Sequence, residues 1–504
     1  MRFFSVFRTL LVGTALLVTA FVVRAGAVYR CDVAVLGSGA AGLSAAVAAA
    51  ETGASVMVLE KMPVVGGSSV LAVDYMASLG PRAEAILGKS LSVRSLYEEI
   101  MRSGGGRNDP ELIEKMLLMT GDAYQWLTSM GASLAVPVPV REGGEWAGFR
   151  TDTKGTTVGS EVVKALLRNA ENRRVPIETL SRATEILMKE GRVEGVRITD
   201  IRGDTIYVMA PAVVIATGSY AANPEMVVQH ASERDRSLSA MDYSTNAPGC
   251  TGDGLALGHM AGAAVRDLEL LEFHPTMIAT TGEIISSSVR SRGAILVNER
   301  GERFVNELAP RREVVQAMEK QSGHTAWLIV DDGIMEKDEI LRDHARRIAA
   351  VAADSSRELA IRIGVDPKVL CKTLRTYREG RMRSHDEFGR RTMESDLRQG
   401  RLYAYPVRAA VHGTSGGLVI NEHAHVLRED GKPIPGLYAA GDVVSGLNGL
   451  ERVSGMGLVA AVVFGREAGY AASRSARPDL PVLYKPAVSG YSMRLDRYCV
   501  RPCE

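Results

Sequence analysis

The apolar residues near the start of the chain are spaced in a way that predicts two strands with a helix between them. Residues 33–36 are wholly apolar, as in a parallel strand that is buried on both faces. An alanine-rich stretch at about 40–52 predicts a helix, and Gly53 follows it where a left-handed residue commonly ends one. A second apolar run at 55–59 predicts the next strand, so the stretch is expected to form a β-α-β unit.

Glycines occupy the turn between the first strand and the helix at the spacing Gly-x-Gly-x-x-Gly. Gly37 permits the tight turn, Gly39 lets a phosphate approach the backbone, and Gly42 lets the helix pack closely on the strand. The second strand ends at Glu60, the place of an acid that binds ribose hydroxyls, and an ordinary β-α-β unit gives no reason for an acid there. We therefore expect dinucleotide binding by Gly37, Gly39, Ala40, Ala41, Gly42 and Glu60.

Helical and alternating patterns continue along the chain. They predict helical structure at 91–131, 160–169 and 456–472, a helix headed by Gly252-Asp253-Gly254, a β-hairpin of 193–198 with 205–209, and a buried strand at 212–215. Residues 134–157, rich in Gly, Pro and Thr, are expected to form a loop over the cofactor. The basic run 381–391 is expected to be a solvated face, with docking of an acidic electron-transfer partner as the alternative.

The first 27 residues are expected to be a signal peptide rather than part of the fold. Arg2 and Arg8 give a positive start, residues 10–23 are uncharged, and small residues at 25–27 suit cleavage. This pattern predicts an exported protein. The apolar stretch is short for a membrane span, but an uncleaved signal would instead anchor the protein in the membrane.

The net charge, the cysteines and the histidines limit which partners, cofactors and metals are expected. The net charge of +1 implies no nucleic-acid or acidic-surface partner. None of the five cysteines belongs to a Cys-x-x-Cys-His motif, so no c-type haem is expected. Two interpretations are open for Cys499 and Cys503, a disulfide and a pair of free thiols. His423 and His425 lack an evident third ligand, so no metal site is expected.

Several later segments carry motifs that occur together in one protein family. They are Gly-Gly at 66–67, His-Pro-Thr at 274–276, Arg-x-x-Gly-Ala-Ile-Leu-Val-Asn at 290–298, Val-His-Gly-Thr-Ser-Gly-Gly at 411–417, Pro-Gly-Leu-Tyr-Ala-Ala-Gly-Asp at 435–442 and Gly-Leu-Glu-Arg-Val-Ser-Gly at 449–455. With these motifs the chain resembles the flavoprotein subunits of fumarate reductases and succinate dehydrogenases over about residues 31–474. It most resembles their soluble, periplasmic flavocytochrome-type members.

The resemblance implies FAD as the cofactor, bound without a covalent link. Membrane-bound relatives attach FAD through a histidine after the ribose acid, and no histidine lies between Glu60 and Gly80. Asp442 is then placed to bind ribitol hydroxyls, and the helix after Gly455 aims its N-terminus at the flavin ring. Further residues that the resemblance places at the cofactor are Lys61, Gly66, Gly67, Ser68, Ala216, Thr217, Gly218, Asp253, Gly441, Arg452 and Leu458.

The same resemblance implies reduction of an activated alkene. Such a reaction needs a hydride from flavin N5 at one carbon and a proton at the next, while cations hold the charge that develops on a substrate carboxylate. The resemblance implies that His412 and Arg452 clamp one carboxylate. It implies that His274 and the hydroxyl of Ser286 bind the second.

Arg311 is implied to donate the proton. Arginine normally keeps its proton, so this role needs a buried site crowded by other cations and a relay, with Arg290 as its next link. Family members carry a glutamate at the position of Ser287, and further departures are Ile284 for a methionine and Glu451 for an asparagine. Either water or another acid completes the relay, or the substrate differs from fumarate. The expected catalytic positions are Arg311, Arg290 and Ser287.

The expected fold class is α/β. A doubly wound, Rossmann-like FAD-binding domain is expected in two segments, 28–270 and 411–475. An α+β capping domain is expected between them at 271–410, and it should close over the substrate and exclude water. Residues 476–504 are expected to form a C-terminal tail.

The expected function is reduction of an α,β-unsaturated carboxylate, first of all fumarate to succinate. The sequence shows no second glycine turn for NADH and no haem motif, so a separate redox protein is expected to donate the electrons. Two alternatives stay open. One is another enoate, such as urocanate, an acrylate or an itaconate-like acid, and the other is a flavin-binding protein without catalysis.

Overall fold

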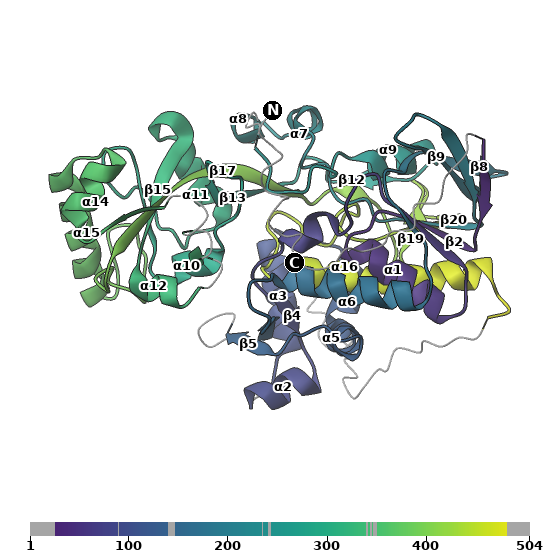
Figure 1. The fold of residues 1–504 in the computed structure, drawn as a ribbon, viewed down its shortest axis with the longest axis horizontal. Coiled ribbons are helices and arrows are strands. Elements are labelled where there is room, and N and C mark those ends of the chain that lie inside the picture. Colours follow the sequence, from purple (N-terminus) through teal and green to yellow (C-terminus); the bar gives the residue numbers. More distant parts are fainter. Residues whose placement is uncertain are drawn as a thin grey trace, which may run out of the picture.

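A computed structural model describes residues 26–480 except 89, 140–146, 234, 240–242, 339–340, 343–344 and 346–349. The ribbon has two lobes, and β17 (Leu402–Thr414) runs from one towards the other (Figure 1). The predicted signal peptide, apart from its last two residues, lies outside the described residues. Cys499, Cys503 and nearly all of the predicted tail lie outside them as well.

A six-stranded sheet forms the centre of the larger lobe. Its strand order is β19-β20-β11-β2-β3-β7, and every neighbouring pair except β19 with β20 is parallel. Every residue of β2 and β11 is buried, as their wholly apolar sequences predict. The strands are β2 (Val33–Leu36), β3 (Val56–Leu59), β7 (Ile177–Glu178), β11 (Ala212–Ile215), β19 (His425–Leu427) and β20 (Pro433–Ala439). The predicted fold class is confirmed, and so are the strands predicted at 33–36, 55–59 and 212–215.

Each face of this sheet is covered by a different layer. Helices α1 (Ala40–Glu51) and α16 (Met456–Ala476) pack on one face, and α6 (Val158–Asn172) lies beside α1 (Figure 1). On the other face β9 packs against β11 and β20 as part of a second sheet of order β1-β10-β9-β8. Its strands are β1 (Val28–Arg30), β8 (Arg182–Lys189), β9 (Arg192–Thr199) and β10 (Thr205–Met209), and the last two form the predicted hairpin.

A third part of the larger lobe joins helices to a small sheet. The prediction of helical structure at 91–131 is confirmed, with breaks between the helices. These helices are α3 (Val93–Ser103), α4 (Pro110–Leu118) and α5 (Thr120–Ser129), preceded by α2 (Pro81–Leu87).

The prediction that residues 134–157 form a loop over the cofactor is wrong. Strands β5 (Val136–Pro139) and β6 (Ala147–Arg150) pair there in a three-stranded sheet with β4 (Met76–Ser78). The sheet forms because β6 buries Ala147 and Phe149. None of the described residues of this segment lines the cavity described below.

The smaller lobe has a hydrophobic core of its own, made of buried residues between Ile278 and Val407. Its sheet has the order β13-β17-β15-β14, with β16 also paired to β17. The elements are β13 (Leu271–Ile278), α10 (Ser287–Ser291), β14 (Ile295–Val297), α11 (Arg311–Glu319), β15 (Thr325–Asp331), α12 (Asp332–Glu336), β16 (Val351–Ala353), α14 (Ser356–Ile363) and α15 (Pro367–Met382). The capping domain was expected over the same elements. Its boundaries stay a prediction, and the end at 410 falls inside β17.

The basic run 381–391 is not a solvated face throughout, because Arg390 is fully buried in the smaller lobe. Its guanidinium donates to Glu307 (Nη1–Oε2 2.7 Å) and to the carbonyl of Arg290 (Nη2–O 2.7 Å). Arg303 shares the same glutamate through two hydrogen bonds of 2.9 and 2.8 Å. Pairing of this kind offsets the cost of burying charge, and here it also fixes the backbone at Arg290.

The remaining elements connect these parts. They are η2 (Gly67–Leu71), α7 (Pro224–His230), α8 (Arg236–Ser239), α9 (Asp253–Met260), β12 (Val265–Arg266), η3 (Ser322–His324) and β18 (Gly417–Leu418). Helix α9 confirms the helix predicted after Gly252. In the described ranges no helix combines the length and the apolar character that crossing a membrane requires.

Helices α1 and α16 approach each other closely because glycines of α16 meet the backbone of α1. A Cβ at Gly465 would lie 2.3 Å from the carbonyl oxygen of Ala41, and one at Gly469 would lie 2.2 Å from that of Ala45. No side chain fits these positions without a backbone shift. The contact therefore sets where α1 begins, and with it the position of the glycine turn.

Replacing Gly469 by alanine should lower the free energy of unfolding by about 1–3 kcal/mol, because the added methyl group meets a fixed backbone. In a helix without that contact the same change would stabilise by about 1 kcal/mol. Urea or thermal unfolding measures the difference. The control is Arg474→Ala at an exposed position of the same helix, which should change stability by less than about 0.5 kcal/mol. A Gly469→Ala protein as stable as its parent would contradict this account of the packing.

Candidate active site

A cavity lies where loops of the larger lobe face the smaller lobe. The loops that follow β2, β3, β11 and β20 line it, and ligands of open α/β sheets bind beyond such carboxyl ends. All the predicted cofactor residues line this cavity except Gly42 and Gly66. The predicted substrate residues His274, Ser286, His412 and Arg452 and the predicted proton donor Arg311 line it too.

The glycine turn accepts no side chain at its two tightest positions. Gly37 has a φ of +104°, and a Cβ there would lie 2.4 Å from the carbonyl oxygen of Ala216. A Cβ at Gly42 would lie 2.0 Å from the carbonyl oxygen of Gly37. Gly42 therefore serves the packing of helix on turn, which explains why it does not face the cavity.

Glu60 is nearly buried, and its carboxylate holds the glycine turn. One oxygen, Oε2, accepts hydrogen bonds from the backbone N–H of Ser38 at 3.0 Å and from its hydroxyl at 2.6 Å. The other, Oε1, accepts from the backbone N–H of Met62 at 2.8 Å. The acid predicted to bind ribose thus lies at the cavity wall and also fixes the turn.

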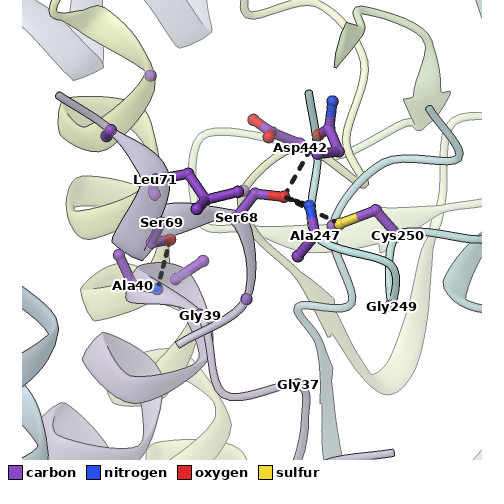
Figure 2. A pocket seen from close by; sticks show the side chains of 18 of the residues that line it. Gly37, Gly39, Ala40, Ser68, Ser69, Leu71, Ala247, Gly249, Cys250 and Asp442 are labelled. Atoms are coloured by element: carbon purple, nitrogen blue, oxygen red, sulfur yellow. Dashed lines mark hydrogen bonds between the residues drawn. The ribbon is translucent and has the colours of Figure 1, made fainter. Parts of the chain in front are cut away.

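The second glycine loop is tied to the first by serine side chains (Figure 2). Ser69 Oγ accepts from the first N–H of α1, at Ala40, over 2.9 Å. Ser68 Oγ accepts from the backbone N–H of Ala247 at 2.9 Å and lies 3.2 Å from Sγ of Cys250. These bonds bring loops distant in sequence to one wall of the cavity.

The chemistry of this wall fits a non-covalently bound FAD. Glycine backbones leave room for phosphates, and Lys61 lies at the wall with Nζ 3.1 Å from Oδ2 of Asp253. The hydroxyl of Thr217 is buried and has no hydrogen-bond partner among the described residues. Burial raises the pKa of Asp442. A polar cofactor would supply partners for these two groups, at positions where the resemblance implies FAD.

Two histidines and an arginine meet at the end of the cavity nearest the smaller lobe. The rings of His274 and His412 are 5.1 Å apart between centroids. Nε2 of His412 lies 3.3 Å from Nη2 of Arg452, and its Nδ1 lies 2.7 Å from the hydroxyl of Thr245. These groups come from β13, β17 and the loop before α16, so both lobes build this end.

A buried carboxylate that the sequence analysis did not single out joins the arginines of this site. Glu272 accepts from Arg311 (Oε1–Nη1 2.5 Å) and lies 3.2 Å from Arg452 (Oε2–Nη2). Burial would raise the pKa of Glu272, but Arg452, His412 and Arg311 hold it below its ordinary value. In turn Glu272 raises the pKa of Arg452. Glu272 and Arg452 are therefore charged, and the contacts of Glu272 hold the two guanidiniums in fixed orientations.

The histidines carry no charge at neutral pH. Burial lowers the pKa of His412 to about 3, although Glu272 opposes the shift. Burial, with His412 and Arg311 nearby, lowers the pKa of His274 well below its usual range. Positive charge at this end of the cavity therefore comes from guanidiniums, and the imidazoles offer hydrogen bonds.

Glu451, one of the departures from the family pattern, does not point at a substrate position. Its carboxylate accepts from the backbone N–H of Arg311 at 3.2 Å, at the start of α11. An acid at a helix N-terminus is stabilising. The guanidinium of Arg311 also donates from Nη2 to the hydroxyl of Ser454 at 3.0 Å. The backbone and side chain of Arg311 are thus both held by the larger lobe.

Arg290 and Ser287 do not line the cavity. Arg290 is buried behind it and donates from Nη1 to the hydroxyl of Thr276 at 2.9 Å, while its Nε has no partner in the part of the chain that the structure describes. Burial, with Arg311 close by, lowers the pKa of Arg290 to about 9. This is low for an arginine, so Arg290 can lose a proton in the alkaline range.

Asp74 and Tyr75 line the cavity and were also missed from the sequence. The hydroxyl of Ser286, expected to bind a substrate carboxylate, donates to Oδ1 of Asp74. Oδ2 of the same carboxylate lies 3.5 Å from the hydroxyl of Ser287. Burial raises the pKa of Tyr75, so its hydroxyl keeps its proton at neutral pH.

Some of the missed residues had a signal in the sequence. Glu272 stands two residues before His274 in a predicted active-site segment, and side chains two apart in a strand share a face. Asp74 follows the glycine loop at 66–67 by seven residues, and this spacing alone does not predict where its side chain points.

No group of three or more metal-ligating side chains occurs within the part of the chain that the structure describes. Nδ1 of His423 lies 3.0 Å from Oε1 of Glu467. Nδ1 of His425 lies 3.3 Å from Oδ1 of Asn421. The two histidines thus have protein partners in the larger lobe.

Comparisons with known proteins agree with this geometry. The FAD binding domain family matches residues 32–458. The chain is 35% identical over 445 residues to a "Fumarate reductase (cytochrome)" of Shewanella frigidimarina, which covers 88% of this chain and 77% of that protein. It is 34% identical to the "NADH:fumarate oxidoreductase" of Klebsiella pneumoniae over 88% of this chain, and it spans 48% of that longer protein.

A solved structure is also similar, the open conformation of a flavocytochrome c3 fumarate reductase. Its TM-score is 0.78 at 31% sequence identity, and the match covers 89% of this chain and 79% of that one. The family match, the relatives and the cavity together establish FAD as the cofactor. The chain belongs to the FAD binding domain family, among the FAD-dependent oxidoreductases of the fumarate reductase and succinate dehydrogenase flavoprotein type.

Proposed function

We propose that the chain reduces the carbon–carbon double bond of an α,β-unsaturated carboxylate. The observation that carries the proposal is that Arg311, Arg452, His274 and His412 line the same cavity as the FAD-binding loops. Fumarate is the first substrate to assay, because the resemblance implies it and because similar relatives bear the name fumarate reductase. The alternatives are another enoate and a flavin-binding protein without catalysis.

In this proposal the guanidinium of Arg452 binds the carboxylate that activates the alkene, with His412 beside it. Bound FAD supplies the hydride. As negative charge develops on the carboxylate, the fixed guanidinium stabilises it without having to reorient. His412 contributes a hydrogen bond and no charge, because burial keeps its imidazole neutral.

Arg311 donates the proton to the other carbon of the alkene. Its backbone is held by Glu451, and its guanidinium by Glu272 and Ser454. Such positioning is what general acid catalysis requires. Arg290 then restores the proton, and its lowered pKa suits a group that gives up a proton and regains it.

The electron donor and the cellular location belong to the same proposal. The predicted signal peptide implies export to the periplasm, where a separate redox protein would reduce the flavin. If the signal is not cleaved, the same segment would anchor the enzyme in the membrane with its cavity outside the cytoplasm.

Replacing Arg311 by alanine should lower kcat at least about a hundredfold, because the proton donor is lost. Purified protein loaded with FAD is assayed by the oxidation of reduced viologen on adding fumarate or another enoate. Flavin absorbance after gel filtration shows whether FAD stays bound, and we expect it to do so.

The matched control is Arg300→Gln, at an exposed arginine of the smaller lobe that does not line the cavity. It should leave turnover unchanged. If Arg311→Ala turns over like its parent, Arg311 is not the proton donor. If the parent holds FAD and reduces no enoate, the protein is a flavin-binding protein without this activity.

Turnover should fall as the pH rises through about 9, where the buried Arg290 loses its proton. Turnover falls rather than rises with pH because only the protonated guanidinium of Arg290 can return a proton to Arg311. The measurement is kcat against pH from about pH 6 to about pH 10 with saturating substrate. In Arg290→Gln kcat should be lower and the alkaline limb absent. A parent profile that stays level to the end of this range, or a limb that survives in Arg290→Gln, would count against the relay.

A further inference from the structure

The end of the cavity nearest the smaller lobe carries an acid, Asp74, where a dicarboxylate would place its second carboxylate. The resemblance assigned that carboxylate to His274 and to the hydroxyl of Ser286. In the structure this hydroxyl donates to Asp74, and all three residues line the cavity. An anion bound by Ser286 would therefore meet the carboxylate of Asp74 at close range.

The groups around Asp74 reduce this repulsion but do not reverse it. Arg150, on β6, has Nη2 3.8 Å from Oδ1 of Asp74, beyond hydrogen-bond distance. Its Nε donates to the backbone carbonyl of Asp74 at 2.9 Å, which directs the guanidinium past the carboxylate. The neighbouring His274 is uncharged, because burial lowers its pKa. Among the residues that the structure describes, Arg150 is the cation paired with Asp74, at 3.8 Å, so its charge is already shared with this acid when a second anion approaches.

The guanidiniums at this end of the cavity have enough positive charge for one substrate carboxylate. Arg311 and Arg452 carry two positive charges, and Glu272, in contact with both, carries one negative charge. The net charge of this trio is therefore +1, which one substrate carboxylate neutralises. A dianion would leave one negative charge unbalanced in a cavity of low dielectric, where like charges repel strongly.

We propose that the site prefers an α,β-unsaturated monocarboxylate whose far end is uncharged or donates a hydrogen bond to Asp74, over a dicarboxylate such as fumarate. The proposal rests on the enoate reduction proposed above and names its substrate class. Asp74 acts in it as a specificity residue that repels a second carboxylate and accepts from a donor group.

Fumarate and its monoamide, fumaramate, form a matched pair of probes. They share size and shape, and they differ in whether the far end is an anion or an amide that donates. Two readouts are compared, namely kcat/KM in the viologen assay and the dissociation constant from the change in flavin absorbance on binding to oxidised enzyme. The second readout does not require turnover.

The parent enzyme should favour fumaramate over fumarate about tenfold or more in both readouts, as expected for removal of one like-charge contact. Asp74→Asn should shift the ratio towards fumarate by a similar factor. The control Asp122→Asn makes the same chemical change at an acid that pairs with Arg466 at 2.7 Å outside the cavity, and it should leave the ratio unchanged.

Three results would overturn the proposal. One is a parent enzyme that favours fumarate, and the second is a ratio that Asp74→Asn changes by less than about twofold. The third is an equal loss of kcat with both substrates in Asp74→Asn, which would assign Asp74 to proton delivery. If no enoate is reduced at all, the proposed function fails separately, and the ratio of dissociation constants still decides the selectivity.

Discussion

The buried carboxylate of Glu272 is the contact on which the arrangement of the active site depends. It lies between Arg311, which begins a helix of the smaller lobe, and Arg452, which belongs to the larger lobe. Burying a guanidinium without a partner is costly, and breaking a buried ion pair typically costs about 3–5 kcal/mol. One side chain therefore fixes two cations and also joins the lobes across the cavity. Loss of this contact would disturb both lobes at the place where substrate has to lie between cofactor and proton donor.

Other contacts set the charge and the position of the groups around Glu272, Arg311 and Arg452. The histidines are kept neutral by burial, so they shape the cavity without adding charge. Glu451 holds the first backbone N–H of the helix that carries Arg311. Behind the cavity, Arg390 and Glu307 fix the backbone at Arg290. The arginines thus differ in role according to their partners, which residue type alone does not reveal.

Local signals in the sequence predicted the FAD half of the cavity well, because a glycine turn is specified by neighbouring residues. Gly37, Gly42 and Glu60 lie within a short stretch, and their roles follow from strand and helix packing. Glu272 and Asp74 escaped prediction because their partners are distant in sequence, as in the contact of Asp74 with Ser286. The burial of Arg390 escaped for the same reason, since Glu307 is 83 residues away. The segment 134–157 was misassigned because its glycines and prolines masked two short strands that bury Ala147 and Phe149.

The central claim is that this cavity passes electrons from bound FAD to the double bond of an enoate. The most direct measurement reduces the FAD-loaded protein photochemically without oxygen, mixes it with fumarate or fumaramate, and follows the absorbance of oxidised flavin. The account predicts that the oxidised spectrum returns and that one saturated acid forms for each flavin. A flavin that stays reduced with both acids, in protein that has kept its FAD, would contradict it.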